Sequence, residues 1–82
     1  MSTNETSIHQ SIEALVSEEH ELWKKGESGG LDAAGRKRLE AIGVQLDRFY
    51  DLLHQRQGLR DAGSDPSRAK MRSAKTVEGY VE

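Results

Sequence analysis

The chain has 82 residues and no cysteine, so we expect one small domain without disulfides or thiol chemistry. Its composition, 34% apolar and 32% charged, is typical of a folded chain with a largely hydrated surface. No apolar run approaches the roughly 20 residues that span a bilayer, and the first residues lack the pattern of a signal peptide. These features predict a cytoplasmic protein that does not associate with membranes.

Residues 5–25 carry the first helical pattern. Apolar side chains recur at spacings of three and four residues and form one stripe: Ile8, Ile12, Leu15, Leu22 and Trp23. Ser2 and Asn4 are candidate N-caps for this helix. A glycine-rich turn over residues 26–31 follows, and it is short enough to return the chain in the antiparallel direction.

Residues 33–60 carry the second helical pattern, with Asp32 as its N-cap. Its apolar positions follow a heptad spacing: Leu39, Ile42, Leu46, Phe49 and Leu53. The two stripes predict an all-α fold built on an antiparallel two-helix hairpin that resembles a coiled coil. Alignment of the helices places Trp23 opposite Gly35, where a large ring could fill the space of a missing side chain. The alternative is that Gly35 is a tolerated surface residue.

Some apolar residues of the second helix point away from the seam between the helices, among them Val44, Leu52 and Leu59. Two helices alone bury one stripe each, which gives marginal stability, so these residues need cover. We favour a homodimer that forms a four-helix bundle. The alternative is a tail that folds back with Val77 and Tyr80 as anchors, and both arrangements can occur together.

Residues 61–82 form this tail, which we expect to be partly ordered. A short helical turn after Pro66, capped by Asp65, is predicted, and the rest should be extended or disordered. Residues 54–75 hold six basic and two acidic residues, whereas residues 1–53 are net acidic. This polarity suits docking of the tail on the hairpin as well as it suits an outside partner.

Glu19 interrupts the apolar stripe of the first helix. A carboxylate at a helix seam needs either a partner or access to solvent. Arg36 and Arg38 are candidate partners by alignment, and such a contact would fix the register or the choice of partner. The alternative is that Glu19 reaches solvent at a wet seam.

No group of residues matches a catalytic or cofactor-binding motif. His20-Glu21 lacks the second histidine of a zinc-protease helix, and the glycine turn lacks the Lys-Ser/Thr of a phosphate-binding loop. Asp47, Asp51 and His54 share one face, which we interpret as a hydrated acidic face rather than a metal site. We therefore assign no enzymatic activity, catalytic residue, cofactor or metal, and a metal-binding bundle remains a second alternative.

The basic segment 54–75 supports another alternative. Arg56, Arg60 and four further basic residues could bind phosphate groups in a salt-dependent way. However, the segment contains no aromatic residue before Tyr80, and two aspartates interrupt it. A regulator that contacts nucleic acid, or the transcription or translation machinery, is thus the alternative to a protein-binding role.

Several short segments follow one another in an order typical of a known family: Glu18-Glu19-His20-Glu21-Leu22, Leu46-Asp47, Asp51-Leu52-Leu53 with Gln55-Arg56, Ala62-Gly63 with Asp65-Pro66, and Val77-Glu78-Gly79-Tyr80. In this order the chain resembles, over nearly its whole length, a family of short actinobacterial proteins known as domain of unknown function 2630. The family usually has tryptophan near position 50 and arginine at 54, where this chain has Tyr50 and His54. The resemblance implies a standalone helical protein and supplies no activity or ligand.

The sequence as a whole predicts a non-enzymatic protein-interaction or regulatory module. We expect a homodimer that binds an unidentified protein through the second helix and the tail. The candidate interaction residues are Glu19, Trp23, Tyr50, Leu52, Leu59, Arg56, Arg60, Val77 and Tyr80.

Overall fold

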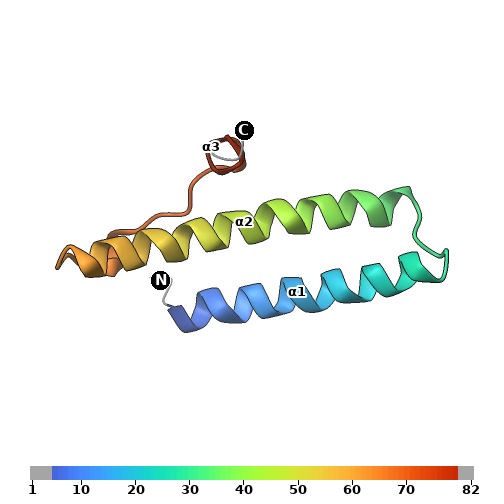
Figure 1. Ribbon diagram of the computed structural model, residues 1–82, viewed down its shortest axis with the longest axis horizontal. Coiled ribbons are helices and arrows are strands. Elements are labelled where there is room, and N and C mark those ends of the chain that lie inside the picture. The colour runs from blue at the N-terminus through green and yellow to red at the C-terminus, as the bar shows by residue number, and fades with distance from the viewer. Residues whose placement is uncertain (1–4, 80–82) are drawn as a thin grey trace.

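The computed structural model describes residues 5–79 and contains two long helices that run antiparallel, side by side (Figure 1). Helix α1 spans Glu5–Glu27 and helix α2 spans Ala33–Asp61; the 3-10 turn η1, Pro66–Arg68, and the short helix α3, Ala74–Glu78, follow. Residues 5–79 contain no strand, and the predicted all-α hairpin is confirmed. Ser2, Asn4 and Tyr80 lie outside the described residues. No helix within the described range is both long and apolar enough to cross a membrane.

Both long helices end before a glycine with a positive φ. Gly29 (φ 77°) follows α1, and Gly63 (φ 74°) follows α2. After each helix, two amides bond back to carbonyls of the last turn, as Ser64 N does to the Leu59 carbonyl at 2.7 Å. This is the hydrogen-bond pattern of a Schellman motif, which favours a left-handed glycine. Helix α1 therefore continues through Gly26, where the sequence pattern placed its end.

The seam between α1 and α2 holds a narrow core. Ile8 and Ile42 are fully buried, and Leu46 is buried beside them. Asp32 caps α2 as predicted, since its Oδ1 accepts a hydrogen bond from the Gly35 amide at 2.8 Å. Because most other seam side chains are only half-buried, the hairpin alone has a small core.

The prediction that Trp23 packs against Gly35 is wrong. Trp23 is 54% exposed, and the space beside Gly35 belongs to Leu31 of the turn. A Cβ added to Gly35 would lie 2.5 Å from Leu31 Cδ1, whereas a Cβ added to Gly43 would have no neighbour within 4 Å. The close packing is thus local to the turn, and the indole faces solvent.

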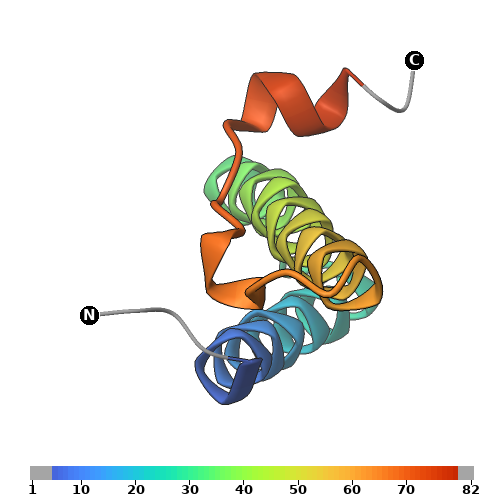
Figure 2. The ribbon, with the colours of Figure 1, turned by 90° about the vertical axis from the view of Figure 1, so that its left-hand side faces the viewer.

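The tail returns along one flank of α2, and α3 crosses above that helix on the side away from α1 (Figure 2). The turn after Pro66 forms as predicted, because Asp65 accepts a hydrogen bond from the Ser67 amide at 2.9 Å. The expectation of an extended or disordered chain beyond that turn is wrong for residues 74–78. There Ser73 accepts a hydrogen bond from the Thr76 amide at 3.2 Å, and this N-cap starts α3.

Candidate interaction site on helix α2 and the tail

The side-chain amide of Gln55 holds the main chain of the tail on α2. Its Nε2 donates to the Lys70 carbonyl at 2.8 Å, and its Oε1 accepts from the Lys70 amide at 3.3 Å. A primary amide carries both a donor group and an acceptor oxygen, so it satisfies both polar groups of one extended residue. The contact therefore fixes the backbone of the tail and is independent of the Lys70 side chain.

Two arginines of α2 bind further main-chain carbonyls of the tail, one on each side of Lys70. Arg48 Nε donates to the Arg72 carbonyl at 2.9 Å, and Arg56 Nη1 donates to the Pro66 carbonyl at 3.4 Å. Guanidinium groups are charged donors, and their bonds to carbonyls are stronger than those between neutral groups. The segment 66–72 is thus bound along its length by side chains that contact peptide groups.

One contact in this site depends on a particular tail side chain. Asp51 is only 13% exposed; its Oδ2 lies 3.4 Å from Arg72 Nε and also accepts from Gln55 Nε2 at 2.8 Å. The carboxylate therefore orients the Gln55 amide and attracts the tail arginine at the same time.

Apolar side chains lie beneath these polar contacts. Leu52 is 4% exposed and shares a groove with Phe49 and Met71, so the tail covers a residue that points away from the seam. Leu59, which has no counterpart on α1, lines a neighbouring groove with Ala69 of the tail, as the alternative of a tail that folds back predicts. The structure thus brings the predicted residues Leu52 and Leu59 together under the tail.

Helix α3 docks on α2 through one apolar and one acidic contact. Val77 is buried, with 6% of its surface exposed, as expected for an anchor of the tail. The carboxyl group of Glu78 shares a hydrogen bond with that of Asp47, and this bond, burial and charge repulsion raise the pKa of Glu78 above its usual 4.5. The acidic contact opposes docking of α3 while both groups are ionised.

Arg56 and Arg60 clamp the start of α1 onto the end of α2. Glu5 forms ion pairs with both, and Arg56 Nε lies 3.6 Å from Glu5 Oε1. The hydrogen bond from Arg60, followed by the charges of both arginines, lowers the pKa of Glu5 although partial burial opposes this shift. Arg56 also reaches the tail, so this residue, with a side chain 12% exposed, joins α1, α2 and the tail.

Arg38, one of the two candidate partners of Glu19, binds the neighbouring Glu18 instead. Arg38 binds Glu18 with both ends of its guanidinium, at 2.6 Å from Nε and 2.8 Å from Nη2. This hydrogen-bonded pair lowers the pKa of Glu18 and raises the pKa of Arg38. Glu19 is half-buried, as expected at a wet seam.

Trp23 and Tyr50 lie apart from the tail site. With Val16 they are the large apolar side chains that stay exposed among the described residues, at 54% for Trp23, 44% for Tyr50 and 41% for Val16. We call this set the aromatic flank. The structure therefore separates Trp23 and Tyr50 from Leu52, Leu59 and Val77, which lie at the tail.

The acidic residues considered for a metal have other contacts. Asp51 binds Gln55 and Arg72, and Asp47 faces Glu78. Within residues 5–79, no three His, Asp or Glu side chains lie close enough together to hold a metal ion.

Sequence reasoning missed the polar residues that hold the tail. Arg48, Asp51 and Gln55 recur at intervals of three and four residues along α2. They lie beside Leu52 and Leu59, which the sequence marked as uncovered. The sequence signal that could have identified these residues is a polar stripe that lies beside uncovered apolar residues of the same helix.

The model of one protein family, described as "Protein of unknown function (DUF2630)", matches residues 4–82. The chain is 41% identical over 79 residues to "Uncharacterized protein Rv0898c" of Mycobacterium tuberculosis (strain ATCC 25618 / H37Rv) and to "Uncharacterized protein Mb0922c" of Mycobacterium bovis. These alignments cover 95% of this chain and 88% of each relative. No solved structure matches the chain. The predicted resemblance is confirmed, and neither the family nor these relatives indicate a catalytic activity.

Proposed function

This chain belongs to the DUF2630 family, and we propose that it is a cytoplasmic, non-enzymatic protein-interaction module that acts through α2 and the tail. The observation that carries the proposal is the way in which α2 binds its own tail. An extended segment lies over apolar side chains and is held by hydrogen bonds to its peptide groups. This is how many proteins recognise extended segments of other proteins.

A segment of another protein could make the same contacts with α2, because few of them depend on the sequence of the tail. Gln55 and Arg48 contact two carbonyls and one amide of residues 70 and 72, groups that every extended peptide presents, whereas the Arg56 contact goes to the 3-10 turn at Pro66. Met71 of the tail lines the groove around Leu52 together with Phe49, so an apolar side chain of another segment could take the place of Met71 there. A segment of another protein with an apolar residue and a nearby basic residue would satisfy the same site.

The tail therefore acts as an internal competitor. Segments that are held by few contacts and have little buried surface open locally before the rest of a protein unfolds. Opening of residues 66–72 would expose Leu52 and Leu59 to a partner. A partner binds by replacing the tail, and its affinity is reduced by the cost of displacing it.

Site-specific photo-crosslinking in the host cell tests this function. A photoreactive residue at Leu59 should crosslink to a defined host protein. Gln55→Ala, which weakens tail docking, should raise the yield of that crosslink. Gln57→Ala is the matched control, because Gln57 is exposed and bonds to Asp61 instead of the tail. Crosslinks that reach only the chain's own tail, in both variants, would refute the proposal.

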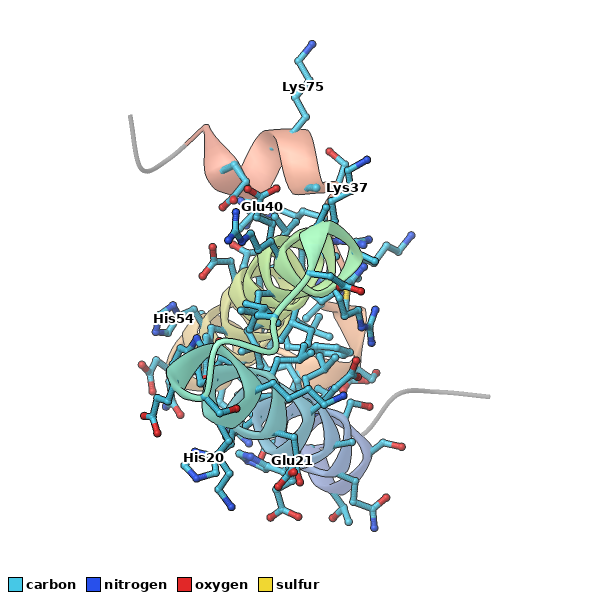
Figure 3. All side chains as sticks on the ribbon, turned by 90° about the vertical axis from the view of Figure 1, so that its right-hand side faces the viewer. His20, Glu21, Lys37, Glu40, His54 and Lys75 are labelled. Carbon is cyan, nitrogen blue, oxygen red and sulfur yellow. The ribbon has the colours of Figure 1, made fainter. Side chains whose placement is uncertain are left out.

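The structure gives less support to nucleic-acid binding. Arg56 and Arg60 pair with Glu5, and Arg72 pairs with Asp51, so half of the basic segment is matched internally. Lys75 does project away from the body (Figure 3). A few unmatched charges without aromatic neighbours form a weak phosphate-binding surface.

A further inference from the structure

The tail is a template for the segments that α2 can bind, because four consecutive tail residues meet the helix in different ways. These residues are Ala69, Lys70, Met71 and Arg72. The backbone is extended at Ala69 (φ −64°, ψ 140°) and again at Ser73 (φ −65°, ψ 155°). A segment that takes the place of the tail must satisfy the same four positions.

The position of Lys70 is recognised through its peptide groups. Gln55 binds both its carbonyl and its amide, while the residue as a whole is exposed. The side chain at this position is therefore free to vary. Proline is excluded, since it has no amide hydrogen to donate to Gln55.

The direction of the bound segment is fixed by a second main-chain contact. Arg48, which binds the Arg72 carbonyl, lies seven residues before Gln55, or about 10 Å along the axis of α2. The segment therefore runs antiparallel to α2, as the chain after η1 does in Figure 1. A segment with the same residues in reverse order would place its apolar and basic side chains at the wrong ends of the site.

Two positions of the segment face apolar grooves. Met71 lines the groove around Leu52, whereas Ala69 borders both that groove and the one around Leu59. A methyl group between two grooves leaves both of them open. The site thus favours a small residue two positions before the apolar one.

The last position is set by the charge of Asp51. This carboxylate is only 13% exposed under the docked tail, and its Oδ2 lies 3.4 Å from Arg72 Nε. A segment with a neutral residue at this position would cover the carboxylate and leave it with the Gln55 amide but no positive charge. Removal of a carboxylate from water without a cation is costly, so the site discriminates against such segments.

We propose that the site binds extended segments of other proteins in which a small residue, any residue except proline, an apolar residue and a basic residue follow one another. Asp51 selects the basic residue and is the main determinant of specificity. This specificity rests on the proposed function, because it describes the partner that displaces the tail.

Peptide binding to the full chain tests this specificity. The host chain carries Met71→Ser and Arg72→Ser, which weaken its own tail and leave α2 unchanged, and its circular dichroism spectrum should remain that of the wild type. A fluorescent peptide with the sequence of residues 65–74 should bind, as measured by anisotropy. The wild-type chain is a second host and should rank all peptides in the same order at lower affinity, since its own tail competes.

Three altered peptides separate recognition from general attraction between charges. Arg72→Gln in the peptide should weaken binding about fivefold, a modest loss because the arginine is 39% exposed and partly screened by water. Lys70→Glu in the peptide changes the net charge by more, yet it should leave the affinity unchanged. The peptide with the reversed sequence should not bind.

A substitution in α2 assigns the selection to one carboxylate. Asp51→Asn keeps an oxygen that can accept from Gln55, and this variant should bind the original and Arg72→Gln peptides equally. Asp47→Asn is the matched control, because Asp47 lies one turn earlier on α2 and faces Glu78 of α3. This control should keep the preference for arginine.

The possible failures are distinguishable. Affinities for the original and Arg72→Gln peptides that agree within about twofold would overturn the specificity while leaving displacement of the tail intact. Tighter binding of an Arg72→Glu peptide would indicate an acidic partner and would also overturn it. If no peptide binds either host, the tail is not replaceable, and the proposed function fails together with this inference.

Discussion

Truncation of Leu52 to alanine measures how much the tail stabilises α2. The Leu52 side chain is 4% exposed although it points away from the seam with α1, so its cover comes from the tail. Leucine-to-alanine substitutions at buried sites cost about 2 to 5 kcal/mol of unfolding free energy. One wall of this site is an irregular segment that can move inward, so we expect the lower part of that range, about 2 to 3 kcal/mol.

The unfolding free energy lost in Leu52→Ala has an upper limit, which is the free energy of docking the tail. No such limit applies to a residue of the seam between α1 and α2. The tail can undock while the hairpin stays folded, because the contacts of 66–72 are separate from the core around Ile42. Once docking is lost, further damage to the same site adds little. Gln55→Ala should therefore destabilise the wild type but have almost no effect in the Leu52→Ala background.

Urea unfolding followed by circular dichroism gives the free energies, and hydrogen exchange of the Lys70 and Gly79 amides reports docking of the tail. Leu52→Ala should speed exchange at both amides, while amides of the central seam stay protected. Gln57→Ala should change the unfolding free energy by less than about 0.5 kcal/mol, as is usual for exposed substitutions. Additive losses for Leu52→Ala and Gln55→Ala, or a loss below that same limit for Leu52→Ala, would refute the tail's role.

Three further predictions concern single side chains. Gly43→Ala should stabilise α2 by up to about 1 kcal/mol, because nothing lies within 4 Å of the added methyl group. Gly35→Ala should gain much less, since its methyl would meet the turn leucine at 2.5 Å; thermal melts compare the two. The raised pKa of Glu78 means that its contribution to α3 docking is present below pH 4.5 and is lost as the pH rises through its folded-state pKa. Glu78→Gln should therefore tighten docking at pH 7 and remove this pH dependence, measured by hydrogen exchange in α3. The pKa of Glu18 is lowered by Arg38, so its stabilisation is present above pH 4.5 and is lost in acid. Glu18→Gln should lower the unfolding free energy at pH 7 and flatten the loss at low pH, measured in urea.

Contrary outcomes are specific for each of these variants. Equal gains for Gly35→Ala and Gly43→Ala would contradict the packing of the turn. An α3 that docks equally well at pH 4 and pH 7 in the wild type would contradict the acidic contact. If Glu18→Gln loses as much unfolding free energy at low pH as the wild type does, that loss belongs to other carboxylates, such as Glu5.

The local features of this fold could be predicted from the sequence, because each depends on residues close together in the chain. Helix periodicity gave the seam around Ile42, and side-chain chemistry gave the caps at Asp32 and Asp65. The path of the tail could not be predicted in the same way. It depends on peptide groups that have no sequence signature, such as those of Lys70, which meet Gln55 only after the chain has reversed.

The position of Trp23 shows a second limit. A heptad alignment treats the helices as ideal rods and matches large residues to small ones. It does not include the turn, and here Leu31 reaches back to fill the space beside Gly35. The indole is then left on the flank, where no part of the described chain covers it. The periodicity of apolar residues alone therefore could not predict that this tryptophan, close to a glycine-rich turn, is exposed.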